Sequence, residues 1–491
     1  MQQPRLLISA AHKSSGKTTL AIGLARALAE RGLAVQTFKK GPDYIDPMWL
    51  ARASGRPCFN LDPHLMHEAE IEALFTRHAR GADVSLVEGN KGLYDGLALD
   101  GSNSNAALAR QLDIPVLLVI DARGMTRGIA PLILGYQAFD RAVRIGGVIL
   151  NQLGGSRHEA KLRAVIEHYT DVPVLGAVQH DDRLAMVERH LGLTPAAEVH
   201  DAERLLAGIA AAVASQVDLD RVRALAASAS GRVVTPLPTP AASASAHGVR
   251  IGIARDAAFG FYYPDDLEAL QAAGATLLPF DTLHDTRLPP VDGLFIGGGF
   301  PEAFMQALEA NTALRAAIRA AVAEGLPVYA ECGGLMVLAR SIRWNGRVAQ
   351  MVGAIPGDVV MHERPVGRGY VRLAETDAFP WPAAPGSDGA NAVRLGHEFH
   401  HSELVNIDPA VRYAYAVQRG HGVDGRHDGV IVNNLLANYA HLRGTGGNQW
   451  PQRFVAFVRQ VADARLAATE PALALQPAPP RRPLIKGALA C

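Results

Sequence analysis

Two short motifs in opposite halves of this sequence contain residues that can do chemistry. The first is a small, hydroxyl-rich loop around a lysine: Ser15, Gly16, Lys17, Thr18 and Thr19. Backbone N–H groups, a lysine and a hydroxyl in such a loop bind the phosphates and Mg²⁺ of a nucleotide. The second motif places Cys332 between Glu331 and two glycines, as in a turn that exposes a nucleophile. Together they indicate an enzyme that activates one substrate with ATP and releases a reactive species from another.

The residues around the first motif have the order that a phosphate-binding loop needs. Leu6–Ser9 is typical of a strand, residues 10–16 of a turn, and a helix is expected from Lys17 to about Glu30. We therefore expect residues 15–19 to bind ATP. The loop departs from the usual pattern, because Ala11 stands where its first glycine belongs, and an ordinary βα turn is the alternative.

Carboxylates follow two further predicted strands of the same half. Asp43 and Asp46 come after the second strand, and Glu88 ends the next strand, Val84–Glu88. The carboxyl ends of parallel strands meet at one edge of a sheet, where binding sites gather. Hard oxygen ligands suit Mg²⁺, so we predict a metal site made by Thr18, Asp46 and Glu88. Turn-forming aspartates at strand ends are the alternative.

The cysteine lies between a predicted strand, Pro327–Ala330, and a predicted helix. A helix N-terminus favours the thiolate of Cys332. The backbone N–H groups of Gly298, Gly299 and Gly333 would form an oxyanion hole. A histidine distant in sequence should act as the base, and the candidates are His397, His400, His401, His427 and His441. Spacing alone favours the last of these only weakly, and a lone cysteine is often just a small buried hydrophobe.

Length and composition limit the class of protein. A chain of 491 residues needs two or three domains. Lys+Arg and Asp+Glu both number 48, and this balance argues against nucleic-acid binding. Three scattered cysteines fit a reducing compartment rather than a disulfide framework or zinc site. No stretch approaches the ~20 apolar residues of a membrane helix. We expect a soluble, cytoplasmic protein with no nucleic-acid or membrane partner.

Buried-strand runs alternate with helical stretches in both halves, which predicts two doubly wound α/β domains with parallel sheets. The predicted strands are Leu6–Ser9, Val35–Phe38, Val84–Glu88, Val116–Asp121, Gly147–Asn151, Val174–Ala177, Val249–Ala254, Leu277–Phe280, Gly293–Ile296 and Pro327–Ala330. We predict a first domain over residues 1–232, a Pro/Ala/Ser linker over 233–247, a second domain over 248–465, and a flexible proline-rich tail over 466–491.

Read in order, the motifs resemble the cobyrinate a,c-diamide synthase family of ATP- and glutamine-dependent amidotransferases. They are SSGKTT (14–19), KGPDYIDP (40–47), VEG (87–89), GLYDG (92–96), GGGFPE (297–302), AECGGLM (330–336), GHEFH (396–400) and NYAHL (438–442). The resemblance extends to about residue 465. It implies a dethiobiotin-synthetase-like P-loop domain followed by a class I glutamine amidotransferase domain.

The resemblance also implies roles for individual residues and substrates. It implies Cys332 as nucleophile and His441 as its base. It implies a tetrapyrrole polycarboxylate, ATP, Mg²⁺ and L-glutamine as substrates and cofactors, with cobyrinate or hydrogenobyrinate converted to its a,c-diamide through an acyl phosphate. The residues expected around the acid substrate are Asp43, Tyr44, Ile45, Lys91 and Asp95. Because the substrate is a polyanion, Lys39, Lys40 and Arg52 are further candidates.

Two departures from the family pattern leave questions open. Class I glutaminases usually carry glutamate two residues after the base, where this chain has Arg443. The cobyrinate-type branch lacks that acid, so what orients His441 stays open. Asn90 and Lys91 stand where relatives usually carry small or apolar residues, which leaves open whether the ring is cobyrinate, hydrogenobyrinate or sirohaem, and whether it carries metal.

Two readings without amidation also remain. The chain would be an ATP-dependent switch if the phosphate loop served only regulated association. It would be a binding protein if the glutaminase-like domain had lost activity. The sequence sets neither the order of amidation nor the oligomeric state, and a homodimer is compatible with it.

Overall fold

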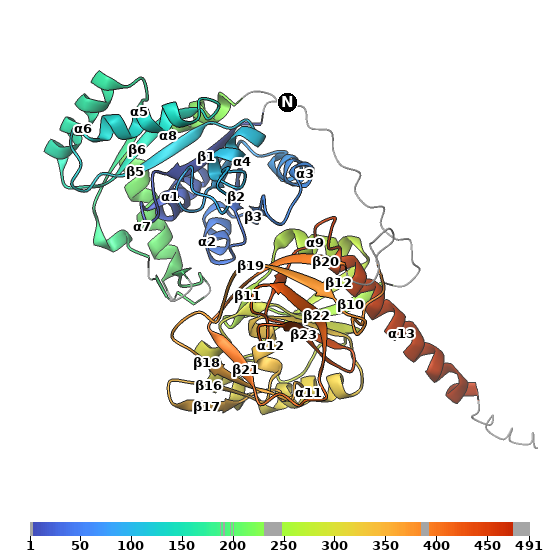
Figure 1. Ribbon diagram of the computed structural model, residues 1–491. Helices are drawn as coiled ribbons and strands as arrows, with labels where there is room; N and C mark the ends of the chain where they lie inside the picture. The colour runs from blue at the N-terminus through green and yellow to red at the C-terminus, as the bar shows by residue number, and fades with distance from the viewer. Residues whose placement is uncertain are drawn as a thin grey trace, which may run out of the picture.

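The computed structural model describes residues 3–186, 188–189, 192–196, 198–199, 201–229, 248–383 and 392–474. The chain forms two α/β units, drawn in blue to green and in yellow to red in Figure 1. The first unit ends with a helix at Ala227, and the second begins with a strand at Val249. The predicted linker over 233–247 lies outside the described residues.

A seven-stranded parallel sheet forms the centre of the first unit. Its strands, in spatial order, are β3 (Phe59–Leu61), β2 (Val35–Lys40), β4 (Val84–Glu88), β1 (Arg5–Ala10), β5 (Val116–Asp121), β6 (Ile145–Leu153) and β7 (Val174–Gln179). A short hairpin of β8 (Glu188–Arg189) and β9 (Gly192–Leu193) follows a 3₁₀ turn at Asp182–Leu184. Because all the sheet strands run the same way, the carboxyl ends of β1, β2 and β4 lie side by side.

Helices cover both faces of this sheet. One face carries α1 (Lys17–Glu30), α2 (Ile45–Ser54), α7 (Ala202–Gln216) and α8 (Leu219–Ala227). The other carries α3 (Glu68–Ala79), α4 (Asn105–Gln111), α5 (Ile129–Phe139) and α6 (Ser156–Tyr169). Strands buried on both faces explain why β1 reads as an almost continuous apolar run.

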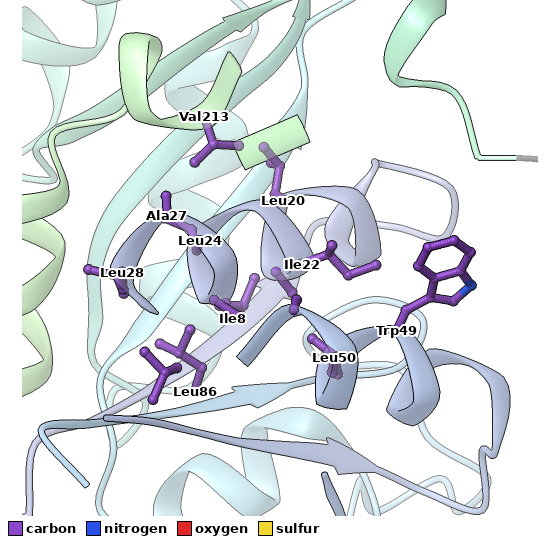
Figure 2. Packing of buried hydrophobic residues seen from close by; sticks show 14 of the residues in the cluster. Ile8, Leu20, Ile22, Leu24, Ala27, Leu28, Trp49, Leu50, Leu86 and Val213 are labelled. Atoms are coloured by element: carbon purple, nitrogen blue, oxygen red, sulfur yellow. The ribbon is translucent and has the colours of Figure 1, made fainter. Parts of the chain in front are cut away.

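Helix α1, which follows the phosphate loop, is buried between the sheet and α7 (Figure 2). Leu24 and Leu28 are fully buried, in one cluster with Ile8 of β1 and Leu86 of β4. On the α7 side, a Cβ on Gly23 would lie 2.5 Å from a methyl group of Val213. Helix α1 is therefore packed on two sides, which helps to fix the position of the loop before it.

The second unit contains a ten-stranded mixed sheet. Its strands, in spatial order, are β12 (Ala275–Phe280), β10 (Val249–Ala254), β13 (Gly293–Ile296), β15 (Val328–Glu331), β24 (Leu435–Asn438), β23 (His427–Val432), β22 (Arg412–Arg419), β19 (Gly367–Glu375), β20 (Val393–His400) and β25 (His441–Leu442). The pairs from β12 to β24 are parallel, and those from β24 to β25 are antiparallel.

Helices again lie on both faces of this sheet. One face packs α10 (Met305–Ala310), α11 (Thr312–Ala323) and α12 (Gly333–Leu338), and the other packs α9 (Pro264–Ala272) and α13 (Trp450–Ala474). A two-stranded sheet pairs β11 (Phe259–Phe261) with β14 (Gly298–Gly299). A four-stranded sheet has the spatial order β17 (Arg347–Gln350), β16 (Ser341–Trp344), β18 (Asp358–Met361) and β21 (Ser402–Val405). The predicted α/β class holds for both units.

The structure differs from the sequence expectations in two places. The antiparallel strands β19, β20, β22 and β23 were not predicted. In β19, β20 and β22, exposed or half-buried residues interrupt the buried ones, so these strands form no continuous apolar run. The buried run of β23 was missed. The predicted flexible tail from residue 466 is also wrong at its start, since α13 continues to Ala474. Alanines favour helix, and they precede the proline-rich end of the sequence. No helix in the described part of the chain is long and apolar enough to cross a membrane.

The two units share a buried boundary. Tyr44 from the loop before α2 stacks on Phe261 of β11, with ring centroids 5.3 Å apart. Tyr370 of β19 donates a 3.0 Å hydrogen bond to Asp62, just beyond β3. One apolar cluster contains Tyr263 and Phe300 of the second unit together with residues of α1 and α2. The carboxyl edge of the first sheet therefore faces the second unit.

Replacing Leu24 by alanine should lower the free energy of unfolding by about 2–5 kcal/mol, because Leu24 is fully buried and its removal leaves a cavity. Urea unfolding followed by far-UV circular dichroism would measure the change. Leu466→Ala is the matched control, since Leu466 is 62% exposed and should change stability by less than about 0.5 kcal/mol. Equal effects of the two substitutions would contradict the packing described for α1.

Candidate active sites

The predicted phosphate loop connects β1 to α1, as the motif requires. Gly16 ends the loop with a φ of +82°, a left-handed conformation that favours glycine. The amide of Asn151, from β6, donates a 2.9 Å hydrogen bond to the carbonyl of Ser15, and a Cβ on Gly16 would collide with that amide. Lys17 is buried at the start of α1, and Thr18 and Thr19 follow it in the same turn. The residues proposed to bind phosphate are therefore held by a neighbouring strand.

The three predicted metal ligands come together beside this loop. The Thr18 hydroxyl donates to Glu88 at 2.6 Å and lies 3.3 Å from Asp46. Lys39 of β2 lies among them, with its Nζ 2.5 Å from Asp46 and 3.1 Å from Glu88. Burial raises the pKa of Glu88, and it acts against ionisation of Lys39 too, but the neighbouring carboxylates outweigh it and raise the pKa of Lys39. Lys39 thus balances two buried negative charges.

The donor set at this point fits Mg²⁺. Mg²⁺ prefers one or two carboxylates, with phosphate oxygens and water completing its coordination. In the described residues, no group of three or more His, Cys, Asp and Glu side chains could hold a metal alone. However, the second carboxylate oxygen of Glu88 is buried and has no hydrogen-bond partner. The Thr18 hydroxyl and the carboxylates of Asp46 and Glu88 are suited to a cation that also binds a nucleotide. One oxygen of Glu88 has no other partner.

The glycine-rich loop after β4 lies against the phosphate loop. Asp95 accepts a 2.8 Å hydrogen bond from the backbone of Gly92, and a Cβ on Gly92 would lie 2.7 Å from the Ala11 carbonyl. Lys91 is exposed and has a φ of +45°. Asn90, the unusual residue beside it, accepts a 3.1 Å hydrogen bond from Lys40.

The predicted acid-substrate residues are not all in one place. Tyr44 and Ile45 are buried at the start of α2, next to Asp43, whose pKa is raised to about 7 by burial and by Asp46. Arg52 does not belong with them, because its guanidinium pairs with Glu203 of α7 at 2.7 Å. Its position on the exposed side of α2 could not be read from its place in the sequence.

Cys332 occupies a strained turn between β15 and α12. Its φ and ψ are +48° and −103°, an unusual conformation for a residue other than glycine and one often found at functional sites. Its backbone N–H donates to the carbonyl of Asn438 at 2.7 Å. A Cβ on Gly333 would lie 2.9 Å from the backbone of Gly299, so the predicted oxyanion-hole segments are in close contact. A Cβ on Gly298 would reach His441 at 2.5 Å, which places the histidine at the same point.

Among the candidate histidines, His441 is the one beside the thiol. Burial lowers its pKa, but hydrogen bonds and attraction from Cys332 and Glu331 outweigh burial and raise the pKa to about 10. His397 stacks on His441 with centroids 5.0 Å apart, and His427 pairs with Asp424 at the surface. His400 and His401 line the pocket described next.

A pocket opens at Cys332. The residues that line it include Gly299, Glu302, Trp344 and Phe399. An acidic group, aromatic walls and a nucleophile suit a small amino acid substrate.

Glu331 has no predicted role from the sequence, although it lies in the cysteine motif. Glu331 is buried, with one carboxylate oxygen 3.3 Å from Nδ1 of His441. The position of Glu331 directly before Cys332 was the feature of the sequence that could have indicated a role for it.

The two centres meet at Tyr44. Its ring centroid lies 5.1 Å from that of His441, while its neighbours Asp43 and Asp46 belong to the carboxylate group near the phosphate loop. The two predicted sites are therefore adjacent across the boundary between the units.

Two family models match the chain and agree with this division. The CobQ/CobB/MinD/ParA nucleotide binding domain matches residues 7–193, and the CobB/CobQ-like glutamine amidotransferase domain matches residues 250–448. The chain is thus a glutamine amidotransferase joined to a nucleotide-binding domain, and it is a glutamine-dependent amidating ligase.

Curated relatives identify the family. A cobyrinate a,c-diamide synthase of Magnetococcus marinus is 46% identical over 93% of this chain and 97% of its own length. Another of that name, from Methanosarcina acetivorans, is 43% identical over 90% of this chain and 92% of its own. This chain belongs to the cobyrinate a,c-diamide synthase family, which confirms the resemblance found in the sequence. A solved structure of PurLQS from Thermotoga maritima covers 45% of the chain with a TM-score of 0.34 at 16% identity.

The pKa of His441 is raised above its ordinary value of about 6.5. We therefore predict that its imidazole stays protonated between about pH 7 and pH 9. Cys332→Ala should lower this pKa, because it removes the hydrogen bond and the attraction from Cys332 that oppose the effect of burial. Nuclear magnetic resonance of ¹⁵N-histidine-labelled protein would follow the ring, with His441→Asn used to assign its signal. A wild-type titration near pH 6.5 would contradict the proposed contact with Cys332.

Proposed function

We propose that this chain converts cobyrinate or hydrogenobyrinate into its a,c-diamide, using ATP and the amide nitrogen of glutamine. The observation that carries the proposal is the contact between the two centres, where Tyr44 beside the carboxylate group packs against His441. A reactive nitrogen released at Cys332 has a short way to travel to an acid activated next to Lys17. The names of the curated relatives supply the substrate class.

In the second unit, Cys332 attacks the side-chain amide of glutamine. His441 holds the proton taken from the thiol, and the backbone N–H groups of Gly298, Gly299 and Gly333 stabilise the developing oxyanion. The protonated imidazole then donates to the departing ammonia. Water hydrolyses the thioester, which releases glutamate and restores the thiol.

In the first unit, a substrate carboxylate attacks the γ-phosphorus of ATP to give an acyl phosphate and ADP. Residues 15–19 would hold the nucleotide, and Lys17 would offset charge on the transferred phosphoryl group. Mg²⁺ held by Thr18, Asp46 and Glu88 would supply further neutralisation of that charge. Ammonia attacks the acyl carbon, and phosphate leaves as the amide forms.

Placing the two reactions at one buried boundary has a chemical reason. An acyl phosphate hydrolyses in open water, and ammonia in water becomes the unreactive ammonium ion. Tyr44 and Ile45 are buried there, and Asp43, Lys91 and Asp95 come from the loops that border the phosphate site. We assign these five residues to binding of the acid substrate, with Lys40 as an added cation.

One feature favours a second candidate substrate. Asn90 forms a hydrogen bond with Lys40 in the loop that borders the acid site, and Asn90 and Lys91 depart from the family pattern. A changed loop at this place would suit a different ring, such as sirohaem.

Cys332→Ser should reduce glutamine-driven amidation by about 10³-fold or more, because the thiolate nucleophile is lost. Activity with high ammonium salt should persist, since the first unit is intact. Glu88→Gln is the counterpart: it should spare glutamine hydrolysis and cripple amidation with either nitrogen source. Steady-state assays of glutamate release and amide formation would measure both. Loss of both nitrogen sources in Cys332→Ser would overturn the two-centre scheme.

Incubation of the protein with ATP, Mg²⁺ and glutamine should convert cobyrinate or hydrogenobyrinate into a product with two carboxyl groups amidated. Mass spectrometry of separate reactions with these rings and with sirohaem would measure the outcome. Product from sirohaem alone would move the assignment to the second candidate, and no product from any ring would contradict the proposed substrate class.

A further inference from the structure

A buried carboxylate beside Cys332 and His441 has no part in the mechanism above. Glu331 is 2% exposed, so its carboxylate is shielded from solvent. One oxygen lies 3.3 Å from Nδ1 of His441. The other accepts hydrogen bonds from the Tyr329 hydroxyl at 2.6 Å and from the backbone N–H of Leu442 at 2.9 Å. Glu331 therefore contacts both the ring of His441 and the peptide group that follows it.

Arg443 stands where class I glutaminases usually carry the acid that orients the base, and it makes other contacts here. Arg443 donates to the carbonyl of Asn60 at 2.6 Å and pairs with Asp265 at 2.8 Å. Its guanidinium also lies over the ring of Tyr263, 4.6 Å from the centroid. This side chain points to the boundary with the first unit. Within the part of the chain that the structure describes, no carboxylate other than Glu331 is hydrogen-bonded to His441.

The backbone explains how a residue next to the nucleophile reaches the base. β15 pairs in parallel with β24, and the register places Glu331 opposite Asn438. The amide of Asn438 donates to the Tyr329 hydroxyl at 3.3 Å and to the Ala440 carbonyl at 2.7 Å. The segment between Asn438 and His441 therefore folds back over the end of β15, where the Glu331 side chain lies.

We infer that Glu331 is the positioning residue of the glutaminase centre, in the place of the missing acid after the base. Its carboxylate accepts a hydrogen bond from the Nδ1–H group of His441. The other ring nitrogen is then left to face Cys332. Glu331 also stabilises the imidazolium that forms when the thiol proton is transferred. This inference rests on the proposed roles of Cys332 and His441.

The charges agree with this role. A buried carboxylate without a cation partner is costly, and its cost falls when a positive charge forms next to it. The protonated imidazole of His441 is that partner, because the Tyr329 hydroxyl and the Leu442 amide are neutral donors. One strained turn thus supplies the nucleophile from Cys332 and the carboxylate from Glu331.

Glu331→Gln tests the inference, because the amide keeps the shape and loses the charge. We expect kcat for glutamine hydrolysis to fall by about 10²–10⁴-fold while KM changes by less than about 3-fold. Amidation driven by ammonium salt should be unchanged, which shows that the protein is folded. The pH at which iodoacetamide alkylates Cys332 rapidly should move upward, a change that a structural role alone would not cause.

Three controls make every outcome decisive. Glu375→Gln removes a buried carboxylate paired with Arg394 and Arg453, away from the thiol, and should leave the pH profile of alkylation unchanged. Cys332→Ala is run in parallel: if it still hydrolyses glutamine, the proposed function fails whatever Glu331 does. If Glu331→Gln does not fold, ¹⁵N spectra of the wild-type protein decide, since a His441 ring without a proton on Nδ1 would overturn the inference. An unchanged kcat and alkylation profile in a folded Glu331→Gln would overturn it as well.

Discussion

The arrangement of this protein depends on one buried boundary, where the carboxyl edge of the first sheet meets the glutaminase unit. Arg443 makes a buried polar contact there, since it is 1% exposed and joins the Asn60 carbonyl to Asp265. Burial of a guanidinium is tolerated only with such partners. The stacked rings of Tyr44 and Phe261 provide the apolar part. Because these contacts fix the two units, the loop that carries Asp43 and the first turn of α2 that carries Asp46 lie close to His441.

Charge balance determines the geometry of both centres. In the first unit, Lys39 lies between Asp46 and Glu88 and pairs with both carboxylates. In the second, Glu331 and His441 form the corresponding pair. Each centre brings a buried acid and a base together, so each is held in a defined geometry by the fold. The strained backbone at Cys332 adds to this order, because the surrounding glycines leave little room for another conformation.

Much of this could be predicted from the sequence, and the omissions have physical causes. The parallel strands were found because strands buried on both faces leave continuous apolar runs. The phosphate loop was found because the motif SSGKTT lies where the first strand leads into the first helix. Strands β19, β20 and β22 were missed because one face of an antiparallel strand can face solvent, which interrupts the apolar run. Glu331 was quoted in a motif but given no role, because its contact with His441 depends on how residues 438–442 fold back. The same holds for Arg443, because its partner Asn60 lies in the other unit.

The apolar cluster that crosses the boundary limits how these units can be exchanged by engineering. Tyr263 and Phe300 pack with residues of α1 and α2, so neither unit has a complete surface of its own. A glutaminase module grafted from another enzyme would leave Tyr44 facing a mismatched surface and would leave the Asn60 carbonyl without its arginine. In this family, ammonia donor and acceptor would have to be recombined as a fused pair.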